Sequence, residues 1–336
     1  MTTISEPETV AAPVRPDRRI AALDDLRGFA LCGIIFINIP QTLEMFDYAG
    51  QLPDVLRVFF LGRFYPIFYL LFGIGFGIFL RSARRRSPRP RTLFLRRFAA
   101  LGFAGALLHL IQPGEVLLPF AVTGVLVLLP FSYLEGRALL TAGGVLTVLG
   151  VLVGVGGLGL LPGLFVLGFA LADLDVPARL TRSAGALVAI GAAAVVTGSL
   201  AWTLIAMELH DIVQIRLGLM FSLSMATGYV VLFLLALRTP AVAALSWVLG
   251  PMGRMALTNY MTAAMLFVPI GAAMDLRGSS DWTAAALLGL GILAAQALFS
   301  NLWLRGFRYG PLEWAWRCVT YWRWLPIRDR EEHSTA

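Results

Sequence analysis

The feature that most constrains this chain is a series of long apolar runs. A transmembrane helix needs about 20 predominantly apolar residues to cross a hydrocarbon core of roughly 30 Å. The predicted spans are residues 22–41, 58–80, 94–112, 117–134, 138–156, 159–173, 183–206, 217–237, 254–273 and 283–304. The sixth run is short and a glycine-rich turn precedes it, so the helix count around 138–173 stays open. The sequence therefore predicts an all-α polytopic membrane protein with about ten transmembrane helices.

Arginines alternate between the gaps that separate these runs. The chain has no lysine, so its 27 basic residues are all arginines, and residues 81–97 hold eight of them. The N-terminal segment, every second gap after it and the C-terminal tail are rich in arginine, whereas the other gaps carry mainly Asp and Glu. Arginine excess near helix ends marks the cytoplasmic side of a membrane. Both termini are therefore predicted to be cytoplasmic.

The bulk composition sets further expectations about partners and domains. The formal net charge of +7 is concentrated in the predicted cytoplasmic loops, which favours anionic inner-leaflet lipids of the bilayer as partners. No polar domain gathers the arginines, so a nucleic-acid partner is not expected. The two cysteines have no metal-ligand spacing, and no metal is expected. We expect a disordered cytoplasmic segment at 1–19, one transmembrane domain at 20–324 and a cytoplasmic tail at 325–336.

Polar residues within or beside the predicted spans form two groups. A charged side chain exposed to lipid at the centre of a span costs about 3 kcal/mol of insertion free energy, unless it faces a partner or a cavity. The group predicted at the cytoplasmic end comprises Asp24, Arg27, Arg254, Thr258, Asn259, Asn301, Arg305, Glu313 and Arg317. The last two are four residues apart on a predicted interfacial helix flanked by tryptophans. This group could form a binding pocket for an anionic substrate group, or it could only tie helix ends together.

The second group is smaller and is predicted near the outer face. Asn38 lies late in the first span, and His109 ends the third span, with Glu115 following. Histidine is the usual general base near neutral pH, so His109 is the candidate base. A structural role for a histidine at a helix end is the alternative. In the second span, Gly73 and Gly77 are four residues apart, which favours close packing against another helix. The alternative is that these small residues make room for a substrate beside the helix.

Five segments together resemble a known family. LDDLRGFALCGIIFIN, FYPIFYLLFGIGFGIF, RRFAALGFAGALLHLIQPGEVL, GPMGRMALTNYM and YGPLEWAWRCVTY closely resemble the YeiB-like family of bacterial membrane proteins over about Arg19 to Trp324. The C-terminal domain of this family, about 160–324 here, is the domain of unknown function 418. The matching positions are Asp24, Arg27, Gly28, Asn38, Gly73, Gly75, His109, Arg254, Thr258, Asn259, Gly310, Pro311, Glu313 and Arg317.

The first segment is also similar to that of transmembrane acyltransferases, among them the heparan glucosaminide acetyltransferases and, more distantly, the acyltransferase-3 proteins. The resemblance implies transfer of an acyl group from cytoplasmic acyl-CoA, as co-substrate, to an acceptor hydroxyl or amine at the outer face. One departure matters. The heparan enzymes have a catalytic histidine in the loop before the second span, and the loop here, QTLEMFDYAGQLPDVLRVFF, has none. His109 would have to take that part.

Two functions of different class remain. The first is a bacterial inner-membrane acyltransferase in which the cytoplasmic group of residues binds acyl-CoA. His109 then deprotonates a small-molecule, lipid or glycan acceptor, Glu115 orients the imidazole and Asn38 donates a hydrogen bond to the oxyanion. In the second, a transporter or exporter of a small anionic or amphipathic molecule, the two polar groups act as gates. One closed cavity would favour the enzyme, and a continuous path would favour the transporter.

Overall fold

The computed structural model describes residues 21–177, 183–239 and 242–328. The predicted disordered segment 1–19 and residues 329–336 of the predicted tail lie outside the described residues. Within them the chain is all helical. The helices are α1 (Ala21–Thr42), η2 (Ala49–Gln51), α2 (Asp54–Phe59), α3 (Tyr65–Arg84), α4 (Pro90–His109), α5 (Leu117–Thr123), η3 (Gly124–Leu128), α6 (Leu129–Phe131), α7 (Gly136–Val153), η4 (Gly157–Leu160), α8 (Leu161–Asp173), α10 (Ala184–Ile205), α11 (Asp211–Ala236), α12 (Val242–Arg254), α13 (Ala256–Ala273), α14 (Trp282–Gly306) and α15 (Pro311–Tyr321).

Six of the described helices are long and apolar enough to cross a membrane, judged by length and composition alone. They are α3, α7, α10, α11, α13 and α14. Two shorter apolar segments, Leu117–Phe131 and Gly157–Asp173, coincide with the fourth and sixth predicted spans. The remaining two predicted spans correspond to α1 and α4, which carry charged residues within their length. The chain is a multi-pass membrane protein.

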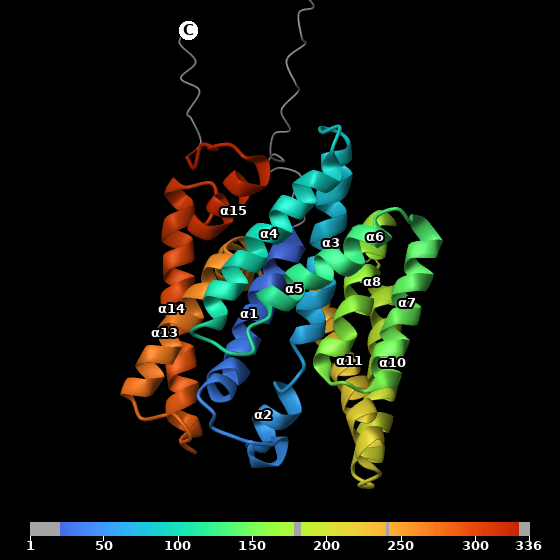
Figure 1. Cartoon of the computed structure of the whole chain (residues 1–336). Coiled ribbons are helices and arrows are strands. Elements are labelled where there is room, and N and C mark those ends of the chain that lie inside the picture. The colour runs from blue at the N-terminus through green and yellow to red at the C-terminus, as the bar shows by residue number, and fades with distance from the viewer. Residues whose placement is uncertain (1–20, 178–182, 240–241, 329–336) are drawn as a thin grey trace, which may run out of the picture.

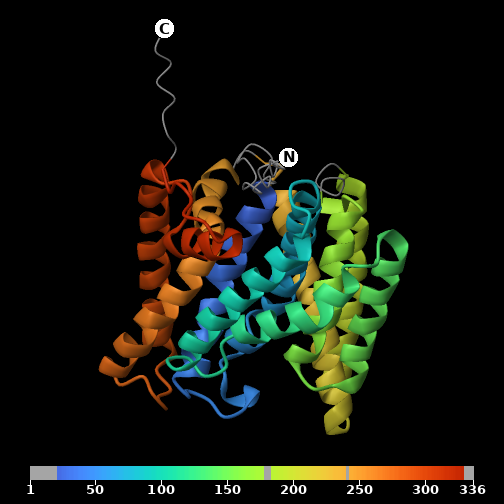
Figure 2. The same cartoon turned by 45° about the horizontal axis from the view of Figure 1, so that its top comes forward.

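The connections of the helices separate into two ends of the bundle. The arginine-rich α3–α4 connection and α15 lie at one end, at the top of Figure 1, whereas α2 and the α10–α11 and α13–α14 connections lie at the other. Helices α4 and α5 cross the front of the bundle obliquely, and α15 lies beside α4 and α13 (Figures 1 and 2). The charge alternation of the sequence therefore coincides with a real division between the two ends.

A helix that the apolar pattern did not predict, α12, packs along α1. The contact is backbone against backbone, because a Cβ on Gly28 would lie 2.2 Å from the carbonyl oxygen of Leu249. The predicted ninth span began at residue 254, but Arg254 ends α12, and α13 begins two residues later. Met255 interrupts the helix with φ −107° and ψ 32°. Arg254 and Thr258 are four residues apart in sequence, but they lie on different helices and so do not share one helical face.

The second predicted span also begins late. Helix α3 starts at Tyr65 and not at residue 58, because α2 occupies 54–59 and a turn with Gly62 at φ +75° follows it. Once begun, α3 packs closely on α8, since a Cβ on Gly73 would lie 2.1 Å from the carbonyl oxygen of Phe165. The close-packing interpretation of Gly73 is thus confirmed. Gly75 lies on another side of α3, where a Cβ would meet the guanidinium of Arg27 at 3.3 Å.

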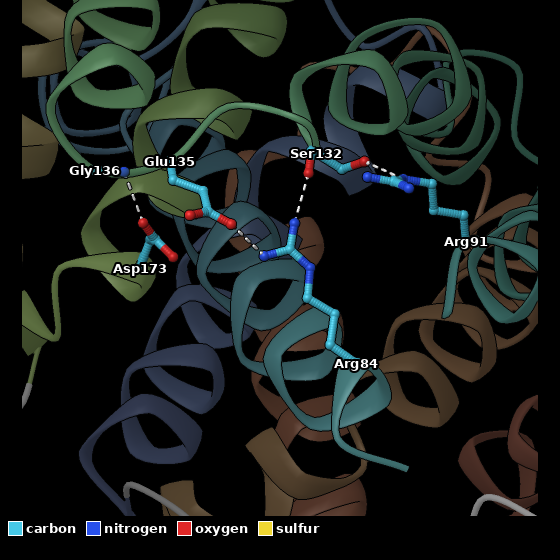
Figure 3. Close-up of polar contacts among 6 residues, drawn as sticks. All are labelled: Arg84, Arg91, Ser132, Glu135, Gly136 and Asp173. Atoms are coloured by element: carbon cyan, nitrogen blue, oxygen red, sulfur yellow. Dashed lines mark hydrogen bonds and ion pairs between the residues drawn. The ribbon is translucent and has the colours of Figure 1, made fainter. Parts of the chain in front are cut away.

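At the arginine-rich end, a polar junction ties α3, α4, α7 and α8 together (Figure 3). Arg84 donates to the carboxylate of Glu135 at 2.8 Å and to the carbonyl oxygen of Ser132 at 2.7 Å. Arg91 donates to the Ser132 hydroxyl at 3.1 Å, and Asp173 accepts from the first N–H of α7 at 2.8 Å. Some of the arginines that mark the cytoplasmic side by sequence therefore also hold helix ends in place.

Candidate functional site

A cavity of about 490 Å³ opens among α1, α3, α4, α5, α13 and α15. Its volume falls within the roughly 300–1,000 Å³ that small-molecule sites occupy. The charged residues that line it are Asp24, Arg27, Arg81, Arg97, Asp175, Arg254, Glu313 and Arg317. They come from helix ends and first turns at the arginine-rich end of the bundle. Five arginines face three carboxylates there, so this charged mouth favours an anion.

Two of the carboxylates in the mouth are paired with arginines across short contacts. Arg27 donates to Asp24 at 2.8 Å within the first turns of α1, and Arg81 of α3 donates to Asp175 at 2.6 Å. The Asp24 side chain is 12% exposed and that of Arg27 is 28% exposed, so the first pair is largely shielded from solvent. These pairs fix two of the guanidinium groups at the edge of the cavity, where they remain able to donate to a second anion.

The third carboxylate, Glu313, holds α15 to the start of α13. Its Oε1 accepts from the backbone N–H groups of Leu257 at 2.7 Å and Thr258 at 3.0 Å, and its Oε2 accepts from the Thr258 hydroxyl at 2.6 Å. A carboxylate from one helix thus caps the N-terminus of another, where the backbone N–H groups have no partner within their own helix. Burial raises the pKa of Glu313, and these hydrogen bonds oppose that shift.

Arg97 enters the mouth from the second turn of α4 and lies between two aromatic rings. Its guanidinium carbon lies 3.6 Å from the ring centroid of Trp316 and 5.0 Å from that of Phe79. The indole N–H of Trp316 donates to the Arg97 carbonyl oxygen at 2.8 Å, so α15 and α4 are joined at this point. Rings on a guanidinium leave its edge free to bind an anion such as a phosphate.

Beyond the mouth the cavity becomes an aromatic shaft. Phe72 and Phe120 pack edge to face with centroids 5.1 Å apart, and the rings of Phe76 and Phe94 lie 4.1 Å apart. The other apolar residues of the shaft include Leu31, Ile34, Phe68, Leu71, Phe98 and Leu101. These contacts arise because the phenylalanines of α3, α4 and α5 lie on facing sides of the three helices. The shaft is therefore lined by apolar side chains that pack against one another.

The floor of the cavity is formed by Tyr65, Val116, Leu117 and Tyr260. The Tyr260 hydroxyl accepts a hydrogen bond from the Val116 backbone N–H at 3.3 Å. The Tyr65 hydroxyl donates to the side-chain oxygen of Gln41 at 3.2 Å. Two phenol groups thus mark the end of the shaft farthest from the arginines, next to the loop that carries Glu115.

The three residues predicted to be catalytic do not line the cavity. His109 is exposed at the C-terminus of α4. Glu115 is buried, and its carboxylate accepts from the backbone N–H groups of Leu117 and Leu118 at the start of α5. Burial raises the pKa of Glu115, while those hydrogen bonds and the nearby His109 lower it. The histidine and the carboxylate are therefore neighbours just outside the floor of the cavity.

Asn38 lies apart from that pair, in a second, small cavity of about 10 Å³ between α1, α13 and α14. Asn259 and Gln296 line the same small cavity. Asn259 donates to the carbonyl oxygen of Met252 and to the hydroxyl of Ser300, both at 3.0 Å. Asn259, which was predicted to bind substrate, instead belongs to a buried hydrogen-bond network that joins α13 to α12 and α14.

The structure brings five of the predicted cytoplasmic residues into the cavity and leaves the others outside it. Asp24, Arg27, Arg254, Glu313 and Arg317 line the mouth. Thr258 stands behind Glu313 as its hydrogen-bond partner. The Asn301 side chain donates to the carbonyl oxygen of Ala297 in its own helix, and Arg305 is exposed. The last two lie on α14, which contributes no lining residue to this cavity.

Sequence reasoning missed several lining residues, chiefly Arg81, Arg97, Asp175, Trp316 and Tyr260. Both arginines lie within the basic run at 81–97, where they served only as indicators of topology. A usable signal existed for Arg97, since it lies inside the apolar run 94–112, where a charge needs a reason. Aromatic residues in apolar helices give no such signal, because most of them pack in the core.

Comparisons with known proteins divide the chain into two matched regions. The family described as "Heparan-alpha-glucosaminide N-acetyltransferase, catalytic" matches residues 19–165. The family described as "Protein of unknown function (DUF418)" matches residues 168–323. No solved structure matches the chain. Of the elements around the main cavity, α1, α3, α4 and α5 belong to the first region, and α13 and α15 belong to the second.

Three curated bacterial proteins are similar to this chain. An "Uncharacterized 39.9 kDa protein in amylase 3'region" of Bacillus acidopullulyticus is 33% identical over 344 residues, which cover 95% of this chain and 99% of that protein. "Uncharacterized protein YxaH" of Bacillus subtilis is 25% identical over 401 residues, covering 95% and 98%. "Uncharacterized protein YeiB" of Escherichia coli is 38% identical over 68 residues, covering 20% and 18%. The chain therefore belongs to the YeiB-like family of bacterial membrane proteins, and in this chain a region similar to the heparan-α-glucosaminide N-acetyltransferase catalytic domain precedes a DUF418 domain.

Proposed function

We propose that this protein is a membrane acyltransferase. It takes a short acyl group from acyl-CoA at the arginine-rich end and transfers it to a hydroxyl or amine of an acceptor at the opposite face. One observation carries the proposal. The region that matches an acetyltransferase catalytic family provides four of the helices around a cavity with an arginine-lined mouth and an aromatic shaft. Such a cavity suits a ligand that is anionic at one end and apolar at the other.

The dimensions of the cavity support acyl-CoA as the ligand. Residues Asp24 and Ile34 both line it and are ten residues apart on α1, a distance of about 15 Å at 1.5 Å per residue. An extended pantetheine arm has about a dozen bonds of roughly 1.3–1.5 Å each and is of similar length. The phosphates would then lie among Arg27, Arg97 and Arg254, whose forked donors suit phosphate oxygens. The acyl group would reach the floor.

The membrane arrangement follows from the charge pattern. We place ten helical segments across the bacterial inner membrane, with both termini and α15 on the cytoplasmic side and anionic inner-leaflet lipids as partners of the arginine-rich end. The separation of basic and acidic connections at the two ends of the bundle supports this orientation. Acyl-CoA is a cytoplasmic metabolite, so its charged end would meet the mouth from the correct side.

For the chemistry at the floor, we assign the base to His109. Its imidazole would take the proton of the attacking hydroxyl or amine, with the Glu115 carboxylate beside it. The proximity of these two side chains supports the pairing. Because Asn38 lines the small cavity and not the main one, the role of donor to the carbonyl oxygen falls to another residue.

The transporter alternative makes a different demand on the same cavity. A transport path would join the arginine-rich mouth to the opposite face in at least one state of the protein. In this structure the lining of the main cavity reaches Tyr65 and Tyr260, next to the loop that carries Glu115. The match of residues 19–165 to an acetyltransferase catalytic family supports the enzyme over the transporter.

Calorimetry of acetyl-CoA binding to the purified protein in detergent tests the proposal. We expect saturable binding that weakens about 10- to 100-fold in Arg27→Ala, because a charge-assisted hydrogen bond to phosphate is lost. Arg305→Ala is the matched control, since Arg305 is exposed and does not line the cavity, and it should bind like the wild type. Absence of binding to well-folded wild-type protein would refute the acyltransferase and favour transport. Acyl transfer that survives His109→Ala would remove His109 from the mechanism.

A further inference from the structure

Tyr260 lies between the main cavity and the small cavity that holds Asn38. It lines the floor of the main cavity and also lines the small cavity that holds Asn38, Asn259 and Gln296. The residue itself is buried. Its backbone position is fixed in the second turn of α13, two residues after Thr258, which is tied to Glu313 of α15. A phenol at the end of a donor site away from the arginines is a candidate for contact with the reacting group.

The hydrogen bonding of this hydroxyl leaves its proton available. A phenol can donate one hydrogen bond and accept others. The contact with the Val116 backbone N–H, at 3.3 Å, uses an acceptor lone pair of the Tyr260 oxygen. Since Val116 is itself a lining residue, the oxygen lies at the level of the floor. This hydroxyl donates to no other side chain or backbone group of the described residues, so its donor capacity is free to serve a ligand in the shaft.

The neighbouring phenol provides a natural comparison. Tyr65 also lines the floor, but its hydroxyl donates to Gln41 at 3.2 Å. Its proton is thus already used within the protein. Of the two phenols at the end of the shaft, Tyr260 is the one whose geometry leaves a donor for a substrate oxygen.

We propose that Tyr260 is a catalytic residue whose hydroxyl donates a hydrogen bond to the carbonyl oxygen of the acyl thioester. This inference rests on the proposed acyltransferase function and names the donor that Asn38 does not supply. The acceptor oxygen or nitrogen bonds to the carbonyl carbon, its proton passes to the base, and the carbonyl π electrons move onto the oxygen that Tyr260 holds. Collapse reforms the carbonyl, breaks the C–S bond and releases CoA thiolate, which takes up the proton.

A donor to the carbonyl oxygen acts more strongly as negative charge develops there. Removing one such donor from an enzyme typically lowers kcat by about 100- to 1,000-fold. In the ground state the same hydrogen bond is weaker, and its net contribution of about 2- to 10-fold in affinity is nevertheless measurable. The ground-state contribution gives a test that needs no knowledge of the acceptor.

The test compares acetyl-CoA with its thioether analogue S-ethyl-CoA, in which a methylene replaces the carbonyl. We expect wild-type protein to bind acetyl-CoA about 2- to 10-fold more tightly than S-ethyl-CoA in calorimetry. Tyr260→Phe keeps the ring and removes the hydroxyl, so it should bind the two ligands equally. Tyr65→Phe removes a hydroxyl from the same floor and should keep the wild-type preference. Thermal unfolding of each variant checks that the fold is retained.

The outcomes separate the two proposals. If wild-type protein binds neither ligand, the acyltransferase proposal fails, and the role of Tyr260 fails with it. If wild-type protein binds both ligands equally, only the role of Tyr260 is overturned, and this result does not depend on the folding of any variant. A thioester preference that persists in Tyr260→Phe overturns it as well. Once an acceptor is identified, Tyr260→Phe should lower kcat for acyl transfer while the KM for acetyl-CoA changes less than 10-fold.

Discussion

The contact between α1 and α12 can be tested with a single methyl group. A Cβ on Gly253 would lie 1.7 Å from the carbonyl oxygen of Asp24, 2.7 Å from its carbonyl carbon and 2.9 Å from the backbone nitrogen of Gly28. All three atoms belong to the backbone, so no side-chain rotation relieves the overlap. Real contacts of a Cβ are not closer than 3.0 Å, and Gly253→Ala would therefore force the two helices apart by more than an ångström.

The expected cost follows from this overlap. Inserting a carbon into a well-packed interface costs about 1–3 kcal/mol, and a backbone clash belongs at the upper end of that range. The better helix propensity of alanine returns up to about 1 kcal/mol. A net loss of about 2 kcal/mol would lower Tm by about 3 °C, because an unfolding entropy of roughly 2.1 cal/mol/K per residue amounts to about 0.7 kcal/mol/K for a chain of 336 residues. Acetyl-CoA binding should weaken too, because Asp24 and Arg254 lie beside the contact.

Thermal unfolding in detergent, followed by tryptophan fluorescence, measures the effect. Gly291→Ala in α14 is the matched control, because a Cβ there would meet nothing within 4 Å. It should leave Tm unchanged or raise it slightly, since alanine favours the helix. If Gly253→Ala is as stable as Gly291→Ala and binds acetyl-CoA normally, α1 and α12 are not in backbone contact and the arrangement of the mouth described above is incorrect.

Three further predictions concern the mouth. Gly75→Leu would place a side chain beside Arg27 in the shaft, so calorimetry should show loss of acetyl-CoA binding with Tm nearly unchanged, and normal binding would contradict the position of Gly75. Arg97→Gln should weaken acetyl-CoA binding about 10-fold and change the fluorescence of Trp316, on which its guanidinium stacks; Arg305→Ala should do neither. Burial raises the pKa of Glu313 above its ordinary value of 4.5, so the folded state holds this proton at pH values where the unfolded state has lost it. The free energy of unfolding should therefore fall as pH rises from 4.5 through the raised pKa of Glu313. The variant Glu313→Gln should flatten the part of the Tm–pH profile that is due to this group. A profile that the variant leaves unchanged would show that Glu313 is not the group responsible.

The helical segments could be predicted from the sequence because lipid imposes a local rule. Each crossing must satisfy its own backbone hydrogen bonds and present apolar side chains, so spans are visible as continuous runs. The helices at 184–205 and 282–306, for example, match the runs at 183–206 and 283–304 within two residues at each end. The local rule failed at α12, where a short helix of 13 residues leads into Arg254 and its apolar run is too short to cross a membrane. It also failed at α3, where α2 and a glycine turn use residues counted as part of the second span.

The candidate site was only partly predictable, because the proximity of residues from different helices is not a local property. Asp24, Arg27, Glu313 and Arg317 stood out as charged residues near apolar runs, and they do meet at one mouth. Arg305 stood out in the same way and lies exposed on α14. Arg97 served in the sequence only as one of the arginines that mark the cytoplasmic side, yet its guanidinium stacks on Trp316 and Phe79 beside the cavity. Which of two similar arginines faces a cavity depends on the rotation of its helix against the neighbours, and periodicity alone does not fix that rotation.

The sequence by itself therefore determined the class of the protein, the approximate positions of its helices and the end at which its positive charge gathers. These follow from hydropathy and charge, which act residue by residue against the surrounding lipid and water. Only the tertiary structure decided that Glu313 caps α13, that Gly253 and Gly28 bring α1 and α12 into backbone contact, and that Tyr260 lines both cavities. These features depend on close packing between segments far apart in the chain, where a single methyl group or the rotation of one helix changes which atoms meet.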